Sequence, residues 1–387
     1  MRKKFFSLDI GNKLIKFCVA EEDENGKVNL LTKLARPIES FNDGEIIDAD
    51  NFLNEVIVPL KEVAFQIGED PKDLILSFSS SYFNSQRAKG KISISEKYVS
   101  EEDIKKCFLI AKASLISSNS EILFEEPIAY FFENGFKVRD PLGMEARSLE
   151  VDLVVIQGLK PSLNKIKDFF NAHGFKVSLV LPNPLPASSI VLPKKDKELG
   201  VILIDFGYKI FNLAIFQESR LSFFQNIKFG LGDILEDLAI DLGVDLQEID
   251  SIFEQLREEK IEKKKAKIKI GRQKYTYTTL FNLIEKRFSF YWKKNNLVDL
   301  FKKIKENFRL PAGIYLIGGG AYMPEIENIL KKNTHYSVKM GNDYQNILSQ
   351  DEKIYLNSLG AISFYQKLSG NKNFWSELKD IFFRIFK

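Results

Sequence analysis

The sequence is poor in cysteine and histidine, and each shortage excludes a kind of site. Its 387 residues hold two cysteines, Cys18 and Cys107, which lie far apart in a strand-like and a helix-like segment. They supply neither a disulfide framework nor the ligand spacing of a zinc site, so a reducing compartment is expected. The two histidines, His173 and His335, stand in no catalytic arrangement and are interpreted as structural.

Long apolar runs are also missing. No stretch of about 18 uninterrupted apolar residues occurs, which excludes a membrane-spanning helix but not a helix that lies in the membrane interface. The start, MRKKFF, is too short an apolar run for a signal peptide, so we expect a cytoplasmic protein. Residues 257–274 hold nine Lys or Arg against three Glu. Without a recognition motif, this run is interpreted as a solvated surface and not as a nucleic-acid site.

The apolar pattern that is present predicts an α/β protein. Hydrophobic residues make up 44% of the chain, which is enough to fill two cores. Strand patterns occur at 5–10, 14–20, 74–79, 151–157, 175–181, 201–206, 211–216 and 313–317, and helical patterns at 48–67, 160–172, 233–242 and 322–332. Strands that alternate with helices in this way are typical of α/β proteins.

The chain repeats one motif. LDIGNK at residues 8–13 recurs as IDFGYK at residues 204–209, with Asp, Gly and Lys in register and an apolar strand after each copy. This indicates an ancient duplication. Each copy predicts a hairpin whose turn presents backbone N–H groups to a phosphate, with the Asp placed for a hydrated divalent cation. One Asp-x-Gly turn is common in structural loops, so the signal lies in the pairing.

A glycine-rich turn forms a third element. The apolar run at 313–317 is followed by Gly318, Gly319, Gly320 and Ala321 and then by a helical pattern from about Pro324. Such a turn lets the backbone approach a nucleotide closely, and the helix dipole favours anionic groups. Taken alone, it is equally consistent with a close-packed turn.

These elements, in this order, resemble the actin, Hsp70 and sugar-kinase superfamily, and within it the FtsA family of bacterial cell-division proteins. The resemblance covers nearly the whole chain. LDIGNKLIKFCVAE is similar to the family's DIGTSKI segment. DPLGM at 140–144 with LEV at 149–151 is similar to N-P-x-G-M…L-E-V, the most specific match. Further matches are GEIID at 44–48 to G-x-I-x-D, PLPAS at 184–188 to P-L-A-S, and LIGGGA at 316–321 to L-T-G-G-G-A.

The resemblance implies an actin-like (ribonuclease H-like) duplicated fold with an inserted small α+β subdomain and a C-terminal amphipathic helix. The expected parts are a first half at 1–80 and 158–198, an insertion at 81–157, a second half at 199–228 and 311–368, its subdomain at 229–310, a linker at 369–373 and a helix at 374–387.

ATP and Mg²⁺ are the implied ligands. The candidate nucleotide-binding residues are Asp9, Gly11, Asn12, Lys13, Lys16, Asp205, Gly207, Tyr208, Lys209, Gly230, Gly232, Gly318, Gly319, Gly320 and Ala321. Asp9 and Asp205 are expected to hold Mg²⁺ through water.

Departures from the family pattern all fall on the nucleotide side. The family's second hairpin, D-I-G-G-G-T-T, is DFGYKIF at 205–211, so two glycines and two hydroxyls are lost. The family's G-G-x-x-I-T-x-D-I-A segment is GLGDILEDLA at 230–239. The family's A-E-x-I-K segment lines up with 249–253, which places Phe253 where a lysine is expected. Asn183 replaces a Glu and cannot deprotonate a water. Lys209 offers a charge in exchange for lost N–H donors. We expect altered nucleotide affinity with weak or absent ATPase activity.

The last residues predict an amphipathic helix with one apolar stripe. Its members are Phe374, Trp375, Leu378, Ile381, Phe382, Ile385 and Phe386, with Lys379 and Arg384 among the cations on the other side. Each large apolar side chain gains about 1.5–3 kcal/mol on burial, so the stripe needs a partner. A membrane surface is the favoured partner and the protein's own core the alternative.

A second basic and aromatic stretch, 281–309, predicts either a peptide-binding groove or an ordinary core-facing helix. Its apolar members include Phe281, Ile284, Phe288, Tyr291 and Trp292. In the FtsA family this subdomain receives the C-terminal peptide of FtsZ, which makes Arg287, Lys293 and Lys294 candidate contacts.

The leading hypothesis is a cytoplasmic actin-like division protein that binds nucleotide, polymerises and tethers the FtsZ ring to the inner membrane. The expected partners are FtsZ, further copies of itself, inner-membrane lipids and other divisome proteins, and the expected place is the cytoplasmic membrane face at the division site. A PilM-like pilus scaffold is the first alternative, but that resemblance lacks the N-P-x-G-M…L-E-V match and the terminal helix. A phosphotransferase or chaperone ATPase is the second, but no catalytic Asp or following substrate domain is found.

Overall fold

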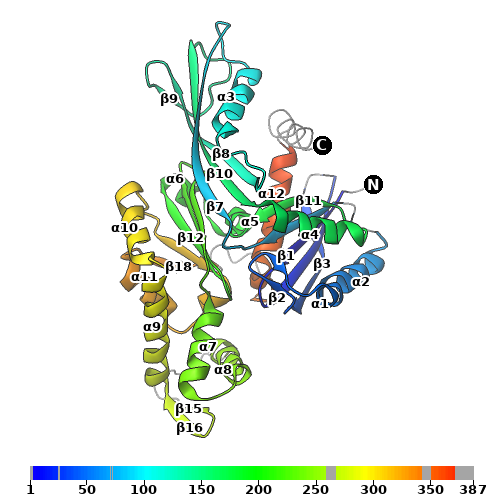
Figure 1. Ribbon diagram of the computed structural model, residues 1–387, viewed down its shortest axis with the longest axis vertical. Helices are drawn as coiled ribbons and strands as arrows, with labels where there is room; N and C mark the ends of the chain where they lie inside the picture. The colour runs from blue at the N-terminus through cyan, green and yellow to red at the C-terminus, as the bar shows by residue number, and fades with distance from the viewer. Residues whose placement is uncertain are drawn as a thin grey trace.

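The computed structural model describes residues 3–24, 27–69, 71, 73–258, 267–341 and 350–370. Two sheets meet near the middle of the molecule, with an elongated insertion at one end and a small helical subdomain at the other (Figure 1). No helix in the described part of the chain is both long and apolar enough to cross a membrane.

The first sheet has the order β11-β6-β1-β2-β3. Its strands are β1 (Lys4–Ile10), β2 (Leu14–Glu22), β3 (Val28–Pro37), β6 (Leu74–Phe78) and β11 (Val177–Pro182). β1, β2 and β3 form an antiparallel meander; β6 pairs with β1 in parallel, and β11 pairs with β6 in parallel. The remaining elements of this half are β4 (Phe41–Asn42), β5 (Glu45–Ile46), α1 (Ala49–Phe52), α2 (Val58–Ile67), α4 (Lys160–Ala172), α5 (Leu185–Val191) and α6 (Lys194–Leu199).

The second sheet repeats this arrangement. β12 (Val201–Phe206), β13 (Phe211–Gln217) and β14 (Arg220–Ile227) form the meander, and β17 (Ile314–Ile317) and β18 (Val338–Met340) add in parallel on the β12 side. The strand order β18-β17-β12-β13-β14 therefore matches β11-β6-β1-β2-β3. The predicted duplicated α/β fold is confirmed by this topology.

The insertion continues the second sheet. Its strands are β7 (Asn84–Ser93), β8 (Ser120–Phe132), β9 (Lys137–Val138) and β10 (Ser148–Leu159), with α3 (Glu101–Ala113) packed on one face over its own core. β7 pairs with β14 at one position, Asn84 opposite Gln225. The ion pairs Lys137–Glu218 (2.8 Å) and Arg139–Glu198 (2.6 Å) add to this junction. The insertion is thus tied to the second half as well as to the first, from which its chain leaves.

Helices of the second half cover one aromatic core. They are α7 (Leu231–Leu242), α8 (Leu246–Glu258), α9 (Tyr277–Lys294), α10 (Leu297–Asn307) and α11 (Ile326–Thr334), with the hairpin β15 (Lys267–Ile270) and β16 (Gln273–Thr276) at the end. The amphipathic face of α9 places Ile284, Phe288 and Trp292 in this core, each at most 1% exposed. Phe288 packs against Phe206 and Phe229.

The final helix, α12 (Leu356–Gly370), returns to the first half. Ala361 is buried against Ile75 and Leu181 of the first sheet. Figure 1 shows α12 beside β1, which brings residues from the end of the described chain close to the first hairpin. The helix ends two residues inside the expected linker, and residues 371–387, which contain the predicted membrane helix, lie outside the described residues.

The predicted elements agree with the structure except at their ends. The helix expected at 48–67 is α1, a π-helical turn at Leu53–Ile57 and α2 in succession. The helix expected from Pro324 is preceded by a 3₁₀ turn at Gly319–Tyr322 and begins at Ile326. Helix ends are where local patterns carry least information, because capping and tertiary contacts set them.

Candidate functional site

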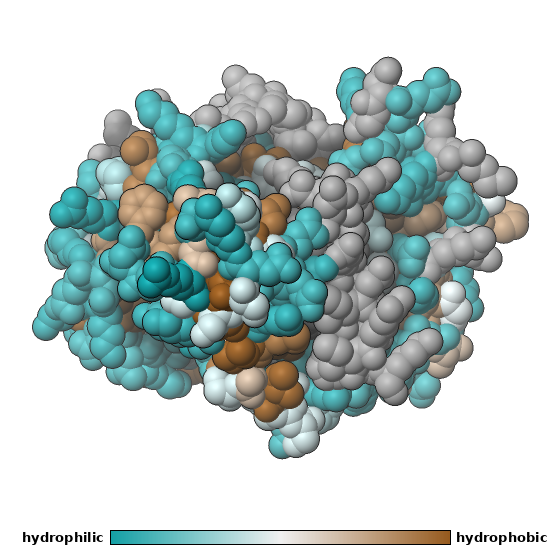
Figure 2. All heavy atoms as spheres, turned by 90° about the horizontal axis from the view of Figure 1, so that it is seen from above, coloured by the Kyte–Doolittle hydropathy of each residue, from teal (hydrophilic) through white to brown (hydrophobic). Residues whose placement is uncertain are grey.

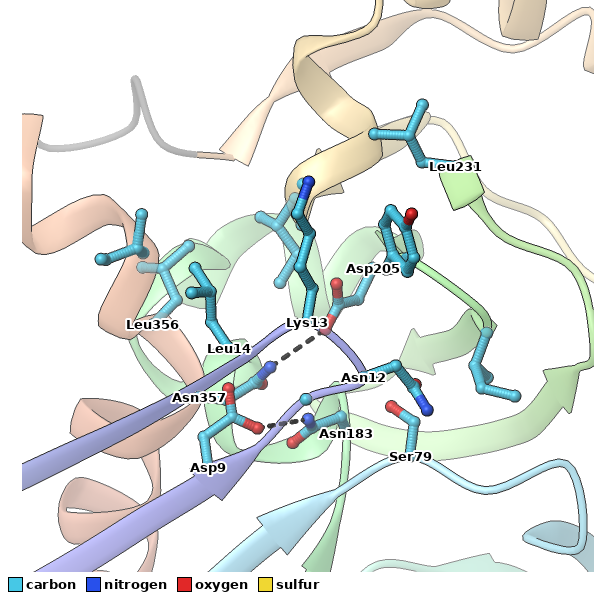
Figure 3. A pocket seen from close by; sticks show the side chains of 18 of the residues that line it. Asp9, Asn12, Lys13, Leu14, Ser79, Asn183, Asp205, Leu231, Leu356 and Asn357 are labelled. Atoms are coloured by element: carbon cyan, nitrogen blue, oxygen red, sulfur yellow. Dashed lines mark hydrogen bonds between the residues drawn. The ribbon is translucent and has the colours of Figure 1, made fainter. Parts of the chain in front are cut away.

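A cavity of about 260 Å³ lies between the two halves, where both hairpins, the glycine turn, α8 and the start of α12 meet. Figure 3 shows Asp9, Asn183, Asp205 and Asn357 converging on it from different elements. Ten of the predicted nucleotide-binding residues line it: Asp9, Gly11, Asn12, Lys13, Lys16, Asp205, Gly207, Tyr208, Gly318 and Gly319. The structure therefore brings both halves of the repeat to one place.

The two hairpin turns have the same local geometry. The N–H of Gly11 donates to Leu14 O at 3.0 Å, and the N–H of Gly207 donates to Ile210 O at 3.0 Å. A Cβ at either glycine would lie 2.8 Å from that same carbonyl oxygen. Since real Cβ atoms do not approach so closely, both turns require glycine for reasons of space.

Asp9, at the end of β1, has both carboxylate oxygens occupied. Lys16 Nζ lies 3.0 Å from Oδ2, and Asn183 Nδ2 donates to Oδ1 at 2.8 Å. The Asp9 side chain is 3% exposed and that of Lys16 is 17% exposed. A carboxylate this deeply buried needs such partners, so Lys16 and Asn183 hold Asp9 in place.

Asp205, the counterpart in β12, has a different set of partners. Asn357 Nδ2, from α12, donates to its Oδ2 at 3.0 Å. Burial raises the pKa of Asp205 from 3.8 to about 6; the hydrogen bond from Asn357 and the charge of Lys16 act against the rise, and the charge of Asp9 adds to it. Asp205 is therefore a carboxylate that is short of positive charge.

The raised pKa predicts a pH-dependent stability. A folded-state pKa above the unfolded value means that the contribution of Asp205 to stability is complete below about pH 4 and is lost as the pH rises through about 6. Asp205→Asn should match the wild type at about pH 4 and exceed it by up to roughly 3 kcal/mol at about pH 8. Urea unfolding at both pH values measures this; an equal difference at both would contradict it.

Three buried amide oxygens indicate what the site lacks. The side-chain carbonyls of Asn183, Asn212 and Asn357 find no hydrogen-bond partner among the described residues. Phosphate oxygens are acceptors and cannot satisfy them, whereas water can. Together with Asp9 and Asp205 they make an oxygen-rich surface, which fits a hard divalent cation held through its water shell.

The three glycines of the glycine turn differ in how closely they are packed. Gly318, with φ +92°, leaves no room for a Cβ beside Asp205 and the Phe206 carbonyl, and Gly320 leaves none beside the Phe206 ring. A Cβ at Gly319 would meet nothing within 4 Å, and Gly319 lines the cavity. Gly320 and Ala321 are buried and do not line the cavity.

Lys209 and the glycines at the start of α7 do not line the cavity. The Lys209 ammonium pairs with Glu236 and lies 3.9 Å from Asp233, both on α7. Gly230 packs against the backbone of Tyr208, and Gly232 against its ring. These residues shape the second hairpin from behind and present no donor to the cavity.

Several lining residues were not predicted. Asn357 is the most important, because it comes from α12 and donates a hydrogen bond to the Asp205 carboxylate; no local pattern in the sequence marks it. Asn183 and Phe253 were noted as departures from the family pattern, and both line the cavity. The remaining unpredicted members include Ser79, Glu254, Tyr322, Met323 and Lys353.

The candidate peptide contacts lie on α9, away from the cavity. Arg287 is engaged internally: its Nε donates to Asp241 Oδ2 at 2.8 Å, and its Nη1 lies 3.4 Å from Asp237. Lys294 stands over the rings of Phe290 and Tyr291, and Phe290 is 51% exposed. Of the apolar residues proposed for a groove, Ile284, Phe288 and Trp292 are core residues, so any groove here is shallower than the sequence pattern indicates.

Comparisons with known proteins agree with this architecture. The family model described as "SHS2 domain inserted in FTSA" matches residues 80–157. The cell division protein FtsA of Bacillus subtilis strain 168 is 24% identical over 376 residues, covering 93% of this chain and 83% of that protein. FtsA of Escherichia coli strain K12 is 21% identical over 362 residues, covering 88% and 84%.

Solved structures show the fold. A chain of the PilM–PilN type IV pilus biogenesis complex aligns with a TM-score of 0.64 at 11% identity, covering 94% of this chain and 99% of that one. MreB5 of Spiroplasma citri bound to ADP aligns with a TM-score of 0.54 at 12% identity, covering 95% and 98%. The duplicated hairpins, the matching insertion and relatives aligned over most of their length agree, so this chain is similar to the FtsA family of actin-like proteins.

Proposed function

We propose that this chain is a cell-division protein that binds an adenine nucleotide between its halves, polymerises, and links an FtsZ ring to the cytoplasmic face of the inner membrane. The observation that carries the nucleotide part is the pair of facing hairpins, each with a buried Asp beside a glycine turn. The relatives named for cell division support the cellular role. The likeness to the PilM–PilN complex, at 11% identity, supports the fold and not a pilus function.

In the proposed complex, Asp9, Asp205 and the three orphaned asparagine carbonyls hold Mg²⁺ through its water shell. Bound there, Mg²⁺ would neutralise phosphate charge. Lys16 lines the cavity and supplies a fixed positive charge next to Asp9, and Gly319 allows a ligand to come close to the backbone.

Hydrolysis is expected to be weak or absent. Asn183 stands where the family pattern has a Glu, and its amide N–H is already donated to Asp9. Asp9 is held by Lys16, so neither group is free to take a proton from an attacking water.

Calorimetric titration with ATP and Mg²⁺, paired with a phosphate-release assay, tests this part of the proposal. We expect saturable binding with turnover far below the roughly 1–1,000 s⁻¹ of ordinary enzymes. Turnover within that range would overturn the weak-hydrolysis claim, and absence of any binding would overturn the nucleotide function.

Membrane attachment is proposed for residues 371–387. They lie outside the described structure, so the proposal rests on the apolar stripe in their sequence. Deleting residues 372–387 should abolish co-sedimentation with anionic vesicles, because that stripe and its cations supply the membrane affinity. Neutral vesicles are the control, and the wild-type chain should bind them less. Unchanged sedimentation of the truncated chain with anionic vesicles would contradict the assignment.

Capture of an acidic FtsZ-type peptide is proposed for the surface around Lys293, Lys294 and the exposed Phe290 at the end of α9. Lys294→Glu should weaken retention of such a peptide in a pull-down, because it reverses a solvent-facing charge. Arg287→Glu is the contrasting variant: it should also lower the thermal midpoint, since it breaks the pairs with Asp241 and Asp237.

We propose that exposed apolar side chains of the insertion contact a neighbouring copy of the chain in the polymer. Large apolar side chains are exposed there: Tyr98, Leu109, Ile110, Ile116, Phe136, Leu142 and Met144. Figure 2, which views the molecule from the insertion end, shows apolar atoms gathered between hydrophilic ones on this face. Such gathered apolar surface is a usual mark of association.

A further inference from the structure

The second hairpin differs from the first in what it presents to the cavity. On the first-half side, Lys16, Asn12 and Ser79 face it with an ammonium and polar side chains. On the second-half side, the corresponding turn presents the ring of Tyr208. Since the two turns have the same backbone geometry, the difference lies in their side chains and in where their hydrogen bonds go.

Three N–H groups at the start of α7 are used within the protein. Gly230 N donates to Asp233 Oδ2 at 2.8 Å, Leu231 N to Gly207 O at 3.0 Å, and Gly232 N to Tyr208 O at 2.7 Å. A helix N-terminus binds an anion through unsatisfied N–H groups, and these three are satisfied. The second hairpin would be expected to bind a phosphate together with the N-terminus of α7. Instead, its Gly207 and Tyr208 carbonyls accept hydrogen bonds from that N-terminus.

Two nearby ammonium groups are also committed. Lys209 is held by Glu236 on the far side of the turn. Lys13, from the first hairpin, reaches across to Asp250 of α8 at 3.1 Å, with its ammonium 5.1 Å from the centre of the Tyr208 ring. Neither lysine is available to a phosphate at the second hairpin unless an existing ion pair is broken.

Tyr208 is held firmly in its position. A Cβ at Gly232 would lie 2.7–2.9 Å from three of its ring atoms, so the ring rests directly on the first turn of α7. Gly230 is equally close to the Tyr208 carbonyl, at 2.2 Å from an added Cβ. Because the ring has backbone on one side and the Lys13 ammonium near it, a ligand cannot displace it without rearranging the hairpin.

We propose that Tyr208 makes this site selective for a nucleoside diphosphate over a nucleoside triphosphate. The inference rests on the proposed nucleotide-binding function. A third phosphate adds charge and several acceptor oxygens, which need donors when they leave water. The first hairpin offers donors for a short phosphate chain, whereas the second offers an aromatic ring.

The test is calorimetric titration of the full chain with ADP and with ATP, each with Mg²⁺, for the wild type, Tyr208→Gly and Tyr208→Phe. The wild type and Tyr208→Phe should bind ADP about tenfold or more tightly than ATP, since both keep the ring. Tyr208→Gly should reduce that ratio to about threefold or less by gaining ATP affinity.

The possible failures are distinguishable. If the wild type binds both nucleotides equally, or if Tyr208→Gly binds ADP with an unchanged ratio, the selectivity is overturned while nucleotide binding stands. If the wild type binds neither nucleotide, the proposed nucleotide function itself fails. Should Tyr208→Gly not fold, the ratio of ADP to ATP affinity is compared between the wild type and Tyr208→Phe. Loss of the ADP preference in Tyr208→Phe would assign the selectivity to the hydroxyl and overturn the role of the ring.

Discussion

Lys16→Met is expected to lower the free energy of unfolding by about 3 kcal/mol or more, because it leaves a buried carboxylate without its cation. Asp9 is 2% exposed, and Lys16 Nζ is its charged partner at 3.0 Å. After the change only the Asn183 amide would remain beside it. Urea unfolding of the two proteins measures the difference, and nucleotide titration should show a loss of affinity at the same time.

Lys13→Met is the matched control in the same hairpin. The Lys13–Asp250 pair is also about 3 Å long, at 3.1 Å, but its side chains are 41% and 24% exposed. Water screens such a pair, so its loss should change stability by no more than about 1 kcal/mol. Combining Lys16→Met with Asp9→Asn should recover much of the loss, since no unpaired charge is then buried. Equal effects of the two single lysine variants would contradict the burial argument.

Gly320→Ala is expected to destabilise the second half by about 3 kcal/mol, near the upper end of the usual effect of overpacking. Its Cβ would lie 2.3 Å from Phe206 Cδ1. Phe206 is fully buried and packs against Phe211, Phe229 and Phe288, so its ring has no room to move aside. The thermal unfolding midpoint reports the change.

Gly319→Ala, one residue earlier in the same turn, supplies the contrast. An added methyl would meet nothing within 4 Å, so stability should stay within about 0.5 kcal/mol of the wild type. Because Gly319 lines the cavity, the methyl should still reduce nucleotide affinity. A large loss of stability at Gly319, or none at Gly320, would show that the turn is not packed as the structure has it.

The two alternatives that the sequence left open for 281–309 depend on which way one helix face points. Ile284, Phe288 and Trp292 recur every four residues, a spacing that makes a stripe on a helix whether it faces a groove or a core. The structure turns that stripe inward against Phe206, Phe211 and Phe229. What remains outside is Phe290 with Lys293 and Lys294, a smaller surface than the pattern indicates.

The second hairpin shows a similar limit. The sequence predicted that Lys209 compensates for lost N–H donors, since it lies next to Tyr208 in the turn. The carboxylate of Glu236, one turn into α7, holds its ammonium behind the hairpin instead. A residue 27 positions away decides the direction of that side chain, and no pattern within the turn contains this information.

The sequence by itself determined the duplicated hairpins, the two Asp residues and the three-glycine turn, because their constraints are local. At Gly11 and Gly207, for example, a Cβ would collide with a carbonyl only three residues further on. Only the tertiary structure decided how the two carboxylates differ. Asp9 receives Lys16 from its own hairpin, whereas Asp205 receives Asn357, which is 152 residues away and reaches it because α12 folds back onto the first sheet. The hydrogen-bond partner of Asp205 thus depends on long-range packing, which local sequence does not encode.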